Sequence, residues 1–281
     1  MTPTAPARTV PGATPPRAGG ALRLLALHAL LELRSSFRST EFAVGAMAVP
    51  VLLYAMFGLP NAAEKLPGGT RVGLAMLVSI GCYGVVSLAI FTFGEDVAKE
   101  RGRGWPRTLA ATPFPTWVHL TGKSVTAVVH ATLVIVVMCA VAAGAGGVRL
   151  PTTAWLAMAG TLASGVLAFS TLGFAIAYLA RPRAATMIAN LVFLPLSFAS
   201  GFFFPLGELP DVIGRIAPWL PTYHFGQLAY RTVLPVADVE FWVGRPVQPA
   251  WVHLVWVLGG AVVFGVATLL AARREAVTRR G

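Results

Sequence analysis

The stretch RVGLAMLVSIGCYGVVSLAIFTFG, residues 71–94, begins with an arginine and continues with 23 residues that carry no charge. A helix rises 1.5 Å per residue, so about 20 apolar residues cross a hydrocarbon core about 30 Å thick. The stretch therefore predicts a transmembrane helix. Five further stretches of the same kind predict five more, near 41–60, 116–146, 152–180, 184–204 and 249–272.

The composition is typical of a chain that is mostly embedded in a lipid bilayer. Mean hydropathy is +0.71, 56% of residues are hydrophobic and 12% are charged, a charged share about half that of a soluble domain. Backbone groups in lipid must be hydrogen-bonded internally, and long helices do this. We predict an all-α integral membrane protein with six transmembrane helices. Cys82 and Cys139 lie in apolar stretches, so neither a disulfide framework nor a zinc site is indicated.

The basic residues are unevenly placed. The formal net charge is +11. Fifteen basic residues fall in the N-terminal arm, the 95–115 loop, the 181–183 turn and the tail, whereas the opposite loops hold six basic and five acidic residues. The positive-inside rule then predicts a multi-pass protein of the plasma membrane with both termini cytoplasmic. The basic character is explained by topology and contact with anionic lipid, not by nucleic acid.

The N-terminal part divides into two segments before the predicted six-span domain, 39–281. Residues 1–20 are rich in Pro, Ala, Thr and Gly and predict a disordered cytoplasmic arm. Residues 21–38 predict an amphipathic helix that lies in the cytoplasmic interface of the membrane. A cleaved signal peptide is the alternative, but charges interrupt its apolar core.

The loop at 95–123, EDVAKERGRGWPRTLAATPFPTWVHLTGK, mixes charges with apolar residues. Pro106 suits the first turn of a short amphipathic helix at the cytoplasmic face, and Pro113 suits its end. The alternative is a solvated charge cluster that merely ends a span, formed by Glu95, Asp96, Lys99, Glu100 and Arg101.

The segment 205–248 is aromatic and is broken by prolines at 205, 210, 218 and 221. Broken helices persist at membrane depth only where they pack against protein. We therefore predict a re-entrant helical segment at the outer face before the last span, with an external loop lying on the membrane as the alternative.

Two runs of residues, both in these segments, carry a family resemblance. The first extends from Glu100 to Lys123 and holds an acid–Arg pair, a glycine step, Leu109–Ala110, Thr112–Pro113 and Gly122–Lys123. The second includes Leu194–Pro195–Leu196, Ser200–Pro205, Leu209–Pro210 and Leu220–Tyr223. Together with the six-span layout they resemble the ATP-binding-cassette (ABC) type-2 exporter permeases, including the daunorubicin-resistance-like transmembrane subunits.

The resemblance implies a cytoplasmic coupling helix that docks on an ABC ATP-binding subunit, which binds ATP and Mg, and a second permease copy, identical or paralogous. No cofactor or metal is expected on this chain. The docking residues would lie in Val97–Ala111, where Trp105–Pro106–Arg107 depart from the usual family pattern. The predicted ATPase-coupling residues are Glu100, Arg101, Arg107, Thr108 and Leu109.

Three rival functions have little support in the sequence. The triplet Gly122–Lys123–Ser124 is a fragment of a phosphate-binding loop, but Trp117 stands where that loop needs glycine. An ion-gradient-coupled transporter would place acids inside spans, and only His130 is titratable deep in one. A membrane-embedded enzyme would need a catalytic cluster, yet the five histidines are scattered along the sequence without acids at ligand spacing.

Substrate information is sparse. The apolar spans carry no fixed charge that would suit a highly charged cargo, so we expect export of a hydrophobic drug-like molecule or lipid, with a polysaccharide as the alternative. Aromatic and amide side chains in the spans are candidates for the substrate path: Tyr83, Phe91, Asn190, Phe198 and Phe202.

Overall fold

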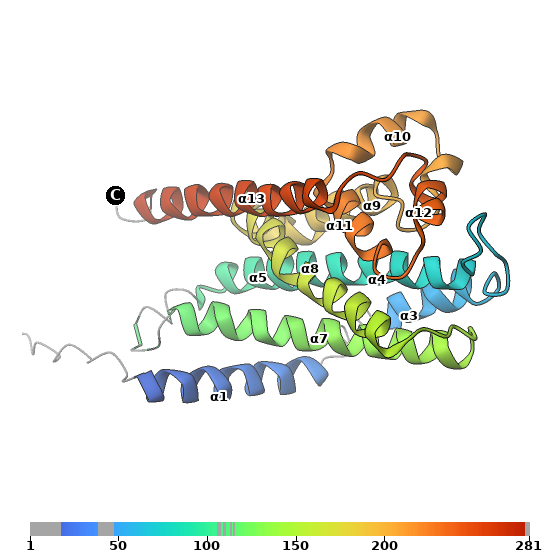
Figure 1. Ribbon diagram of the computed structural model, residues 1–281. Helices are drawn as coiled ribbons and strands as arrows, with labels where there is room; N and C mark the ends of the chain where they lie inside the picture. Colours follow the sequence, from blue (N-terminus) through green and yellow to red (C-terminus); the bar gives the residue numbers. More distant parts are fainter. Residues whose placement is uncertain are drawn as a thin grey trace, which may run out of the picture.

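The computed structural model describes residues 18–38, 48–105, 108, 111–112, 114 and 116–278. Its regular elements there are helices gathered into one elongated bundle (Figure 1). Five helices are long and apolar enough to cross a membrane: Val72–Gly102, Val118–Gly144, Thr152–Leu179, Pro182–Ala199 and Ala250–Arg274. The predicted all-α membrane fold is confirmed.

The first predicted span, near 41–60, is described only in its second half. There α3 (Val49–Leu53) continues into the π-helical η2 (Tyr54–Gly58), and together they form a shorter apolar helix. Residues 41–47 lie outside the described part. Tyr54 is fully buried, and α3 packs on the neighbouring spans. The full length of this span therefore stays a prediction.

The helix of the second span is the centre of the bundle and continues beyond the predicted span. α4 (Val72–Ile90) is apolar on all sides and almost wholly buried, as expected of a helix surrounded by others. The span end predicted near residue 94 stays a prediction, but the helix itself does not end there. The helix continues through π-helical turns, η3 (Phe91–Asp96), into α5 (Val97–Gly102). Two of the charges that suggested an end, Lys99 and Glu95, form an ion pair of 2.7 Å.

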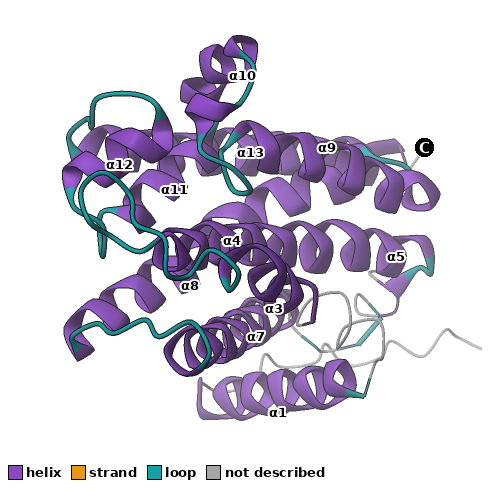
Figure 2. Cartoon of the chain, turned by 90° about the vertical axis from the view of Figure 1, so that its right-hand side faces the viewer, coloured by secondary structure: helices purple, strands orange, loops and turns teal. Residues whose placement is uncertain are grey.

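Four more long helices complete the bundle: α7 (Thr116–Gly144), α8 (Thr152–Leu179), α9 (Ala185–Ala199) and α13 (Ala250–Thr278). The short η4 (Pro182–Ala184) joins α8 to α9. Helix α1 (Ala18–Phe37) runs lengthwise beside the first half of α7 in both Figure 1 and Figure 2. The predicted N-terminal helix is thus present, and its place in the membrane interface stays a prediction. We call the end of the bundle where α1 begins and α5 and α13 end the terminal end.

Between α9 and α13 the chain forms short helices at the opposite end, the loop end: η5 (Leu206–Glu208), α10 (Asp211–Ile216), η6 (Ala217–Trp219), α11 (Pro221–Tyr230) and α12 (Val236–Val243). Helix α11 packs among α4, α8 and α13. Phe225 lies so close to Gly165 that a Cβ there would sit 2.3 Å from the ring. Tyr230 and Ser79 share a buried hydrogen bond of 2.6 Å. The segment therefore returns into the bundle before the last span.

Candidate functional site

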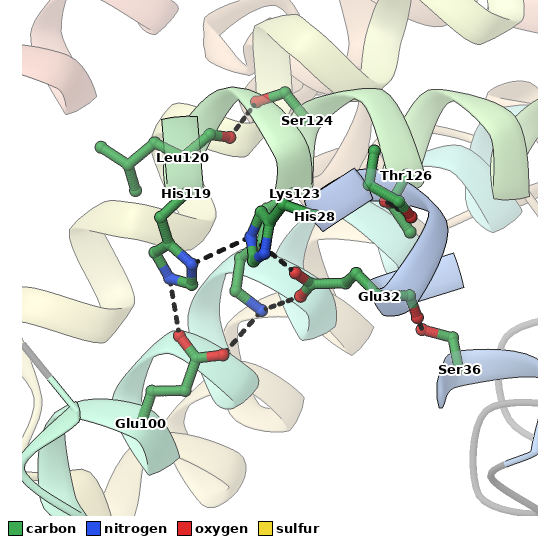
Figure 3. A network of polar contacts seen from close by, with 10 residues as sticks. His28, Glu32, Ser36, Glu100, His119, Leu120, Lys123, Ser124 and Thr126 are labelled. Atoms are coloured by element: carbon green, nitrogen blue, oxygen red, sulfur yellow. Dashed lines mark hydrogen bonds and ion pairs between the residues drawn. The ribbon is translucent and has the colours of Figure 1, made fainter. Parts of the chain in front are cut away.

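Five polar side chains meet at the terminal end and form what we call the terminal-end cluster: His28, Glu32, Glu100, His119 and Lys123. They come from α1, α5 and α7 and point toward one another in Figure 3. The Lys123 ammonium contacts a Glu32 oxygen at 2.7 Å and a Glu100 oxygen at 2.8 Å. The His119 ring joins Glu100 through Nε2 and His28 through Nδ1, both at 3.2 Å. The cluster thus ties three segments together.

Helical spacing explains why these side chains converge. His28 and Glu32 are four residues apart, as are His119 and Lys123, so each pair projects from one face of its helix. His28 Nε2 lies 3.1 Å from Glu32 Oε2. Gly122 lets the two helices approach, because a Cβ at that position would lie 2.4 Å from the His28 ring. The Gly122–Lys123 pair noticed in the sequence is therefore part of the contact between α1 and α7.

The charges of the cluster are largely removed from water. The Lys123 side chain is only 4% exposed, whereas the two carboxylates that flank it are 20% and 27% exposed. Burial lowers the pKa of His28, although the adjacent Glu32 carboxylate opposes this change. The two carboxylates and the one ammonium of the cluster sum to one negative charge. A buried charge of this kind needs partners on every side.

Arg101 attaches α5 to the other side of the bundle. Its guanidinium donates to the carbonyl oxygen of Ala177 and lies 4.4 Å above the Tyr178 ring, a cation–π contact. Val97 and Ala98 are buried against the end of α8 and the start of α9. Helix α5 is therefore fixed on one side by Glu100 and on the other by Arg101.

The predicted ATPase-coupling residues have different positions. Glu100 and Arg101 contact this chain's own helices. Arg107 and Leu109 lie outside the described residues, and Thr108 is exposed. The short helix predicted from Pro106 to Pro113 falls mostly outside the described residues. Helix α5 ends at Gly102 and is followed by a turn in which Gly104 has a positive φ of 79°. Docking on an ATPase stays a prediction for all five residues.

Three of the five substrate-path candidates lie in one row of aromatic rings between α4 and α9. Phe91 contacts Phe193 at 5.7 Å between ring centroids, and Phe193 contacts Tyr83 at 4.9 Å. Tyr83 then contacts Phe203 at 5.1 Å, and Phe203 contacts Phe198 at 4.6 Å. We call these five side chains the aromatic row. The sequence reasoning missed Phe193 and Phe203, although aromatic residues on the same two spans were the available signal.

The other two candidates lie elsewhere. Phe202 is fully buried and packs beside Gly226. Asn190 is exposed, and its amide donates to the Thr186 carbonyl oxygen at 2.9 Å. His130, the relay candidate, is buried and meets the Phe37 ring edge-on at 5.4 Å. Neither Phe202 nor Asn190 therefore belongs to the aromatic row.

The histidines are not scattered in space, which corrects the reading of the sequence. His28, Glu32 and His119 bring metal-ligating atoms within 4.8 Å of one another. A second pair, His224 and His253, lies between α11 and α13 with 2.8 Å between Nδ1 atoms. Sequence spacing could not find these contacts because each joins separate helices.

Comparisons with known proteins agree with this architecture. The family model described as "ABC-2 family transporter protein" matches residues 69–270. YvfS of Bacillus subtilis (strain 168), whose name describes a transport permease, is 23% identical over 90% of this chain and 99% of its own length. YbhR of Escherichia coli (strain K12), whose name describes a multidrug ABC transporter permease, is 26% identical over 75% of this chain and 52% of its own length. The chain therefore belongs to the ABC-2 transporter family and is a multi-pass transmembrane subunit of an ABC transporter.

Proposed function

We propose that this chain is the permease subunit of an ATP-driven exporter that moves a hydrophobic drug-like molecule or lipid out of the cytoplasm or inner leaflet. The family supports the transport role. The apolar aromatic row and the multidrug name of YbhR support a hydrophobic cargo. The charge asymmetry supports a plasma-membrane orientation with both termini, and hence the terminal end, in the cytoplasm.

Energy enters, in this proposal, from a separate ABC ATP-binding subunit that holds ATP and Mg, with two permease copies in the complete transporter. The nearest nucleotide-like triplet, Gly122–Lys123–Ser124, lies inside α7. Its lysine is held by Glu32 and Glu100, and a phosphate-binding loop would need that lysine free and a glycine-rich turn before it. In this proposal the triplet therefore binds no nucleotide.

The observation that carries the proposal is the continuity of α4, η3 and α5. This single helical run extends from Val72 to Gly102. It contributes Tyr83 and Phe91 to the aromatic row and ends beside the turn that is predicted to dock on the ATPase. A displacement of that turn is passed along the run to the row. Glu100 and Arg101 pass the same displacement to α1, α7 and α8.

The docking part is tested by co-purification with the ATPase encoded at the same locus. Arg103 and Trp105 are exposed just beyond α5, so Arg103→Glu and Trp105→Ala alter the outer surface without disturbing the terminal-end cluster. We expect both to weaken capture of the ATPase. The control is Arg215→Glu at the loop end, which is expected to keep it. Equal capture of the ATPase by all variants would show that this turn is not part of the docking surface.

The cargo part is tested in proteoliposomes containing permease and ATPase. A hydrophobic dye is expected to leave the lipid in an ATP-dependent way and to stimulate ATP hydrolysis. Phe193→Ala should reduce stimulation by the dye more than basal hydrolysis, whereas Phe241→Ala, outside the row, should change neither. Transport driven by an ion gradient without ATP would refute the proposed energy source, and stimulation by a polysaccharide alone would refute the proposed cargo class.

A further inference from the structure

Three side chains of the terminal-end cluster bring metal-binding atoms within 4.8 Å of one another between α1 and α7 (Figure 3). His28 Nε2 is 3.2 Å from His119 Nδ1 and 3.1 Å from Glu32 Oε2. A tetrahedral ion with bonds of about 2.0–2.1 Å holds its ligands about 3.4 Å apart. We propose that His28, Glu32 and His119 bind a divalent transition-metal ion of the zinc class and thereby join α1 to α7.

A second observation supports the role of His119 as a ligand. Its Nε2 lies 3.2 Å from Glu100 Oε2. An imidazole that donates its Nε2–H to a carboxylate keeps the lone pair on Nδ1, and this pairing of a carboxylate with a ligand histidine is usual around bound metals. The Nδ1 of His119 is the atom that faces His28. Glu100 is thus a positioning residue that orients the ligand.

The hydrogen-bond geometry of the cluster also suits a metal. His28 Nε2 faces two acceptors, Glu32 Oε2 and His119 Nδ1, when His119 carries its proton on Nε2. One proton on His28 Nε2 then occupies the point where the three ligand atoms converge. A metal ion replaces that proton, which moves to His28 Nδ1 or to water, and the three lone pairs bind the ion.

Lys123 does not occupy the proposed site. Its ammonium contacts Oε1 of both carboxylates, whereas the histidines face the Oε2 atoms. The two carboxylates and the ammonium of the cluster sum to one negative charge, which favours a cation. Two nitrogen donors and one oxygen donor select zinc, cobalt, nickel or copper over magnesium and calcium. The side chains of His28 and Glu32 are 19% and 20% exposed, which leaves a path for the ion and a position for water.

The site would give α1 a second attachment at the end of the bundle where α5 projects. A bound ion would hold α1 on α7 and, through His119 and Glu100, on α5. The metal proposal does not depend on the identity of the cargo or on ATP.

The test uses the full-length chain, purified with a tag that contains no histidine and placed in lipid nanodiscs. Co²⁺ is titrated and its visible absorption recorded, followed by displacement with Zn²⁺. We expect one Co²⁺ per chain with the intense bands of a tetrahedral site, and loss of these bands in His119→Ala. Glu100→Gln should weaken binding about 10- to 100-fold at unchanged stoichiometry, and Glu95→Gln, on the same helix but outside the cluster, should bind as the wild type does.

A folded wild-type chain that binds neither ion overturns the proposal and leaves a cluster held by ion pairs alone. Tetrahedral bands that persist in folded His28→Ala and His119→Ala also overturn it and assign the ion to another site, such as His224 and His253. Folding is checked by helical circular dichroism and a single gel-filtration peak. If His119→Ala fails these checks, the wild-type titration and the graded loss in Glu100→Gln still decide the question.

Discussion

Replacement of Lys123 by methionine should show how strongly the terminal-end cluster holds α1 and α5 against α7. The methionine keeps most of the side-chain volume but removes the ammonium, which is 4% exposed and contacts Glu32 and Glu100. Removing one partner of a buried ion pair costs about 3–5 kcal/mol, because the other partner is left without its countercharge. Here the carboxylates keep 20% and 27% of their side-chain exposure, so water recovers part of the loss.

We therefore expect Lys123→Met to destabilise the folded chain by about 2 kcal/mol. For a chain of this length that corresponds to a fall in Tm of about 4–8 °C. Thermal unfolding in nanodiscs, followed by helical circular dichroism, measures the change. Lys99→Met is the matched control, because Lys99 is 41% exposed in its pair with Glu95 and such a surface pair contributes about 0.3–0.5 kcal/mol.

The triple variant Lys123→Met/Glu32→Gln/Glu100→Gln separates charge from packing. With the carboxylates neutralised as well, no charge is left without its partner, and part of the lost Tm should return. Two results would show that the cluster does not depend on the charge of Lys123. One is an equal fall in Tm for Lys123→Met and Lys99→Met. The other is a fall in Tm for the triple variant that exceeds the sum of the falls for its three single substitutions.

Two further predictions concern packing and capping. Gly173→Ala should destabilise the chain by about 1–3 kcal/mol, because its Cβ would lie 2.6 Å from a backbone carbonyl oxygen of α4. The control is Gly160→Ala on the same helix, whose Cβ would meet nothing within 4 Å. Comparable Tm values for the two variants would contradict this close contact. Asp238→Ala should destabilise the chain by about 1–3 kcal/mol and speed proteolysis of the 59–71 loop. The reason is that the buried carboxylate accepts hydrogen bonds from Gly68 N at 2.6 Å and Thr70 N at 2.9 Å. An unchanged cleavage rate would contradict that role.

Hydropathy located most of the long helices because burial in lipid depends on the local sequence alone. The spans predicted at 116–146 and 152–180 agree closely with Thr116–Gly144 and Thr152–Leu179. The helix does not end at residue 94, although Glu95 and Asp96 look like the start of a loop. The helix continues because Val97 and Ala98 find a buried surface on α8 and α9, and that surface is formed by residues far away in the sequence.

The site was harder to predict than the spans. Glu32 and Lys123 are 91 residues apart, so spacing could not show that each neutralises the other, nor that His28 and His119 are neighbours. Within Phe202–Phe203–Phe204 the sequence favoured Phe202, but the chain leaves α9 through Gly201 at a positive φ of 74°. This turn directs Phe203 toward Tyr83, and helical periodicity does not extend across it.

The central position of α4 has a consequence for how the chain is made. Ser79 on this helix cannot form its hydrogen bond with Tyr230 until Tyr230 is synthesised, 151 residues later. At about 5–20 residues per second, the delay is about 8–30 s. During that time α4 must remain in the membrane without its final neighbours, and its apolar residues on every face let lipid take their place. A nascent chain that stops before α11 therefore leaves the Ser79 hydroxyl without the partner that it has in the complete bundle.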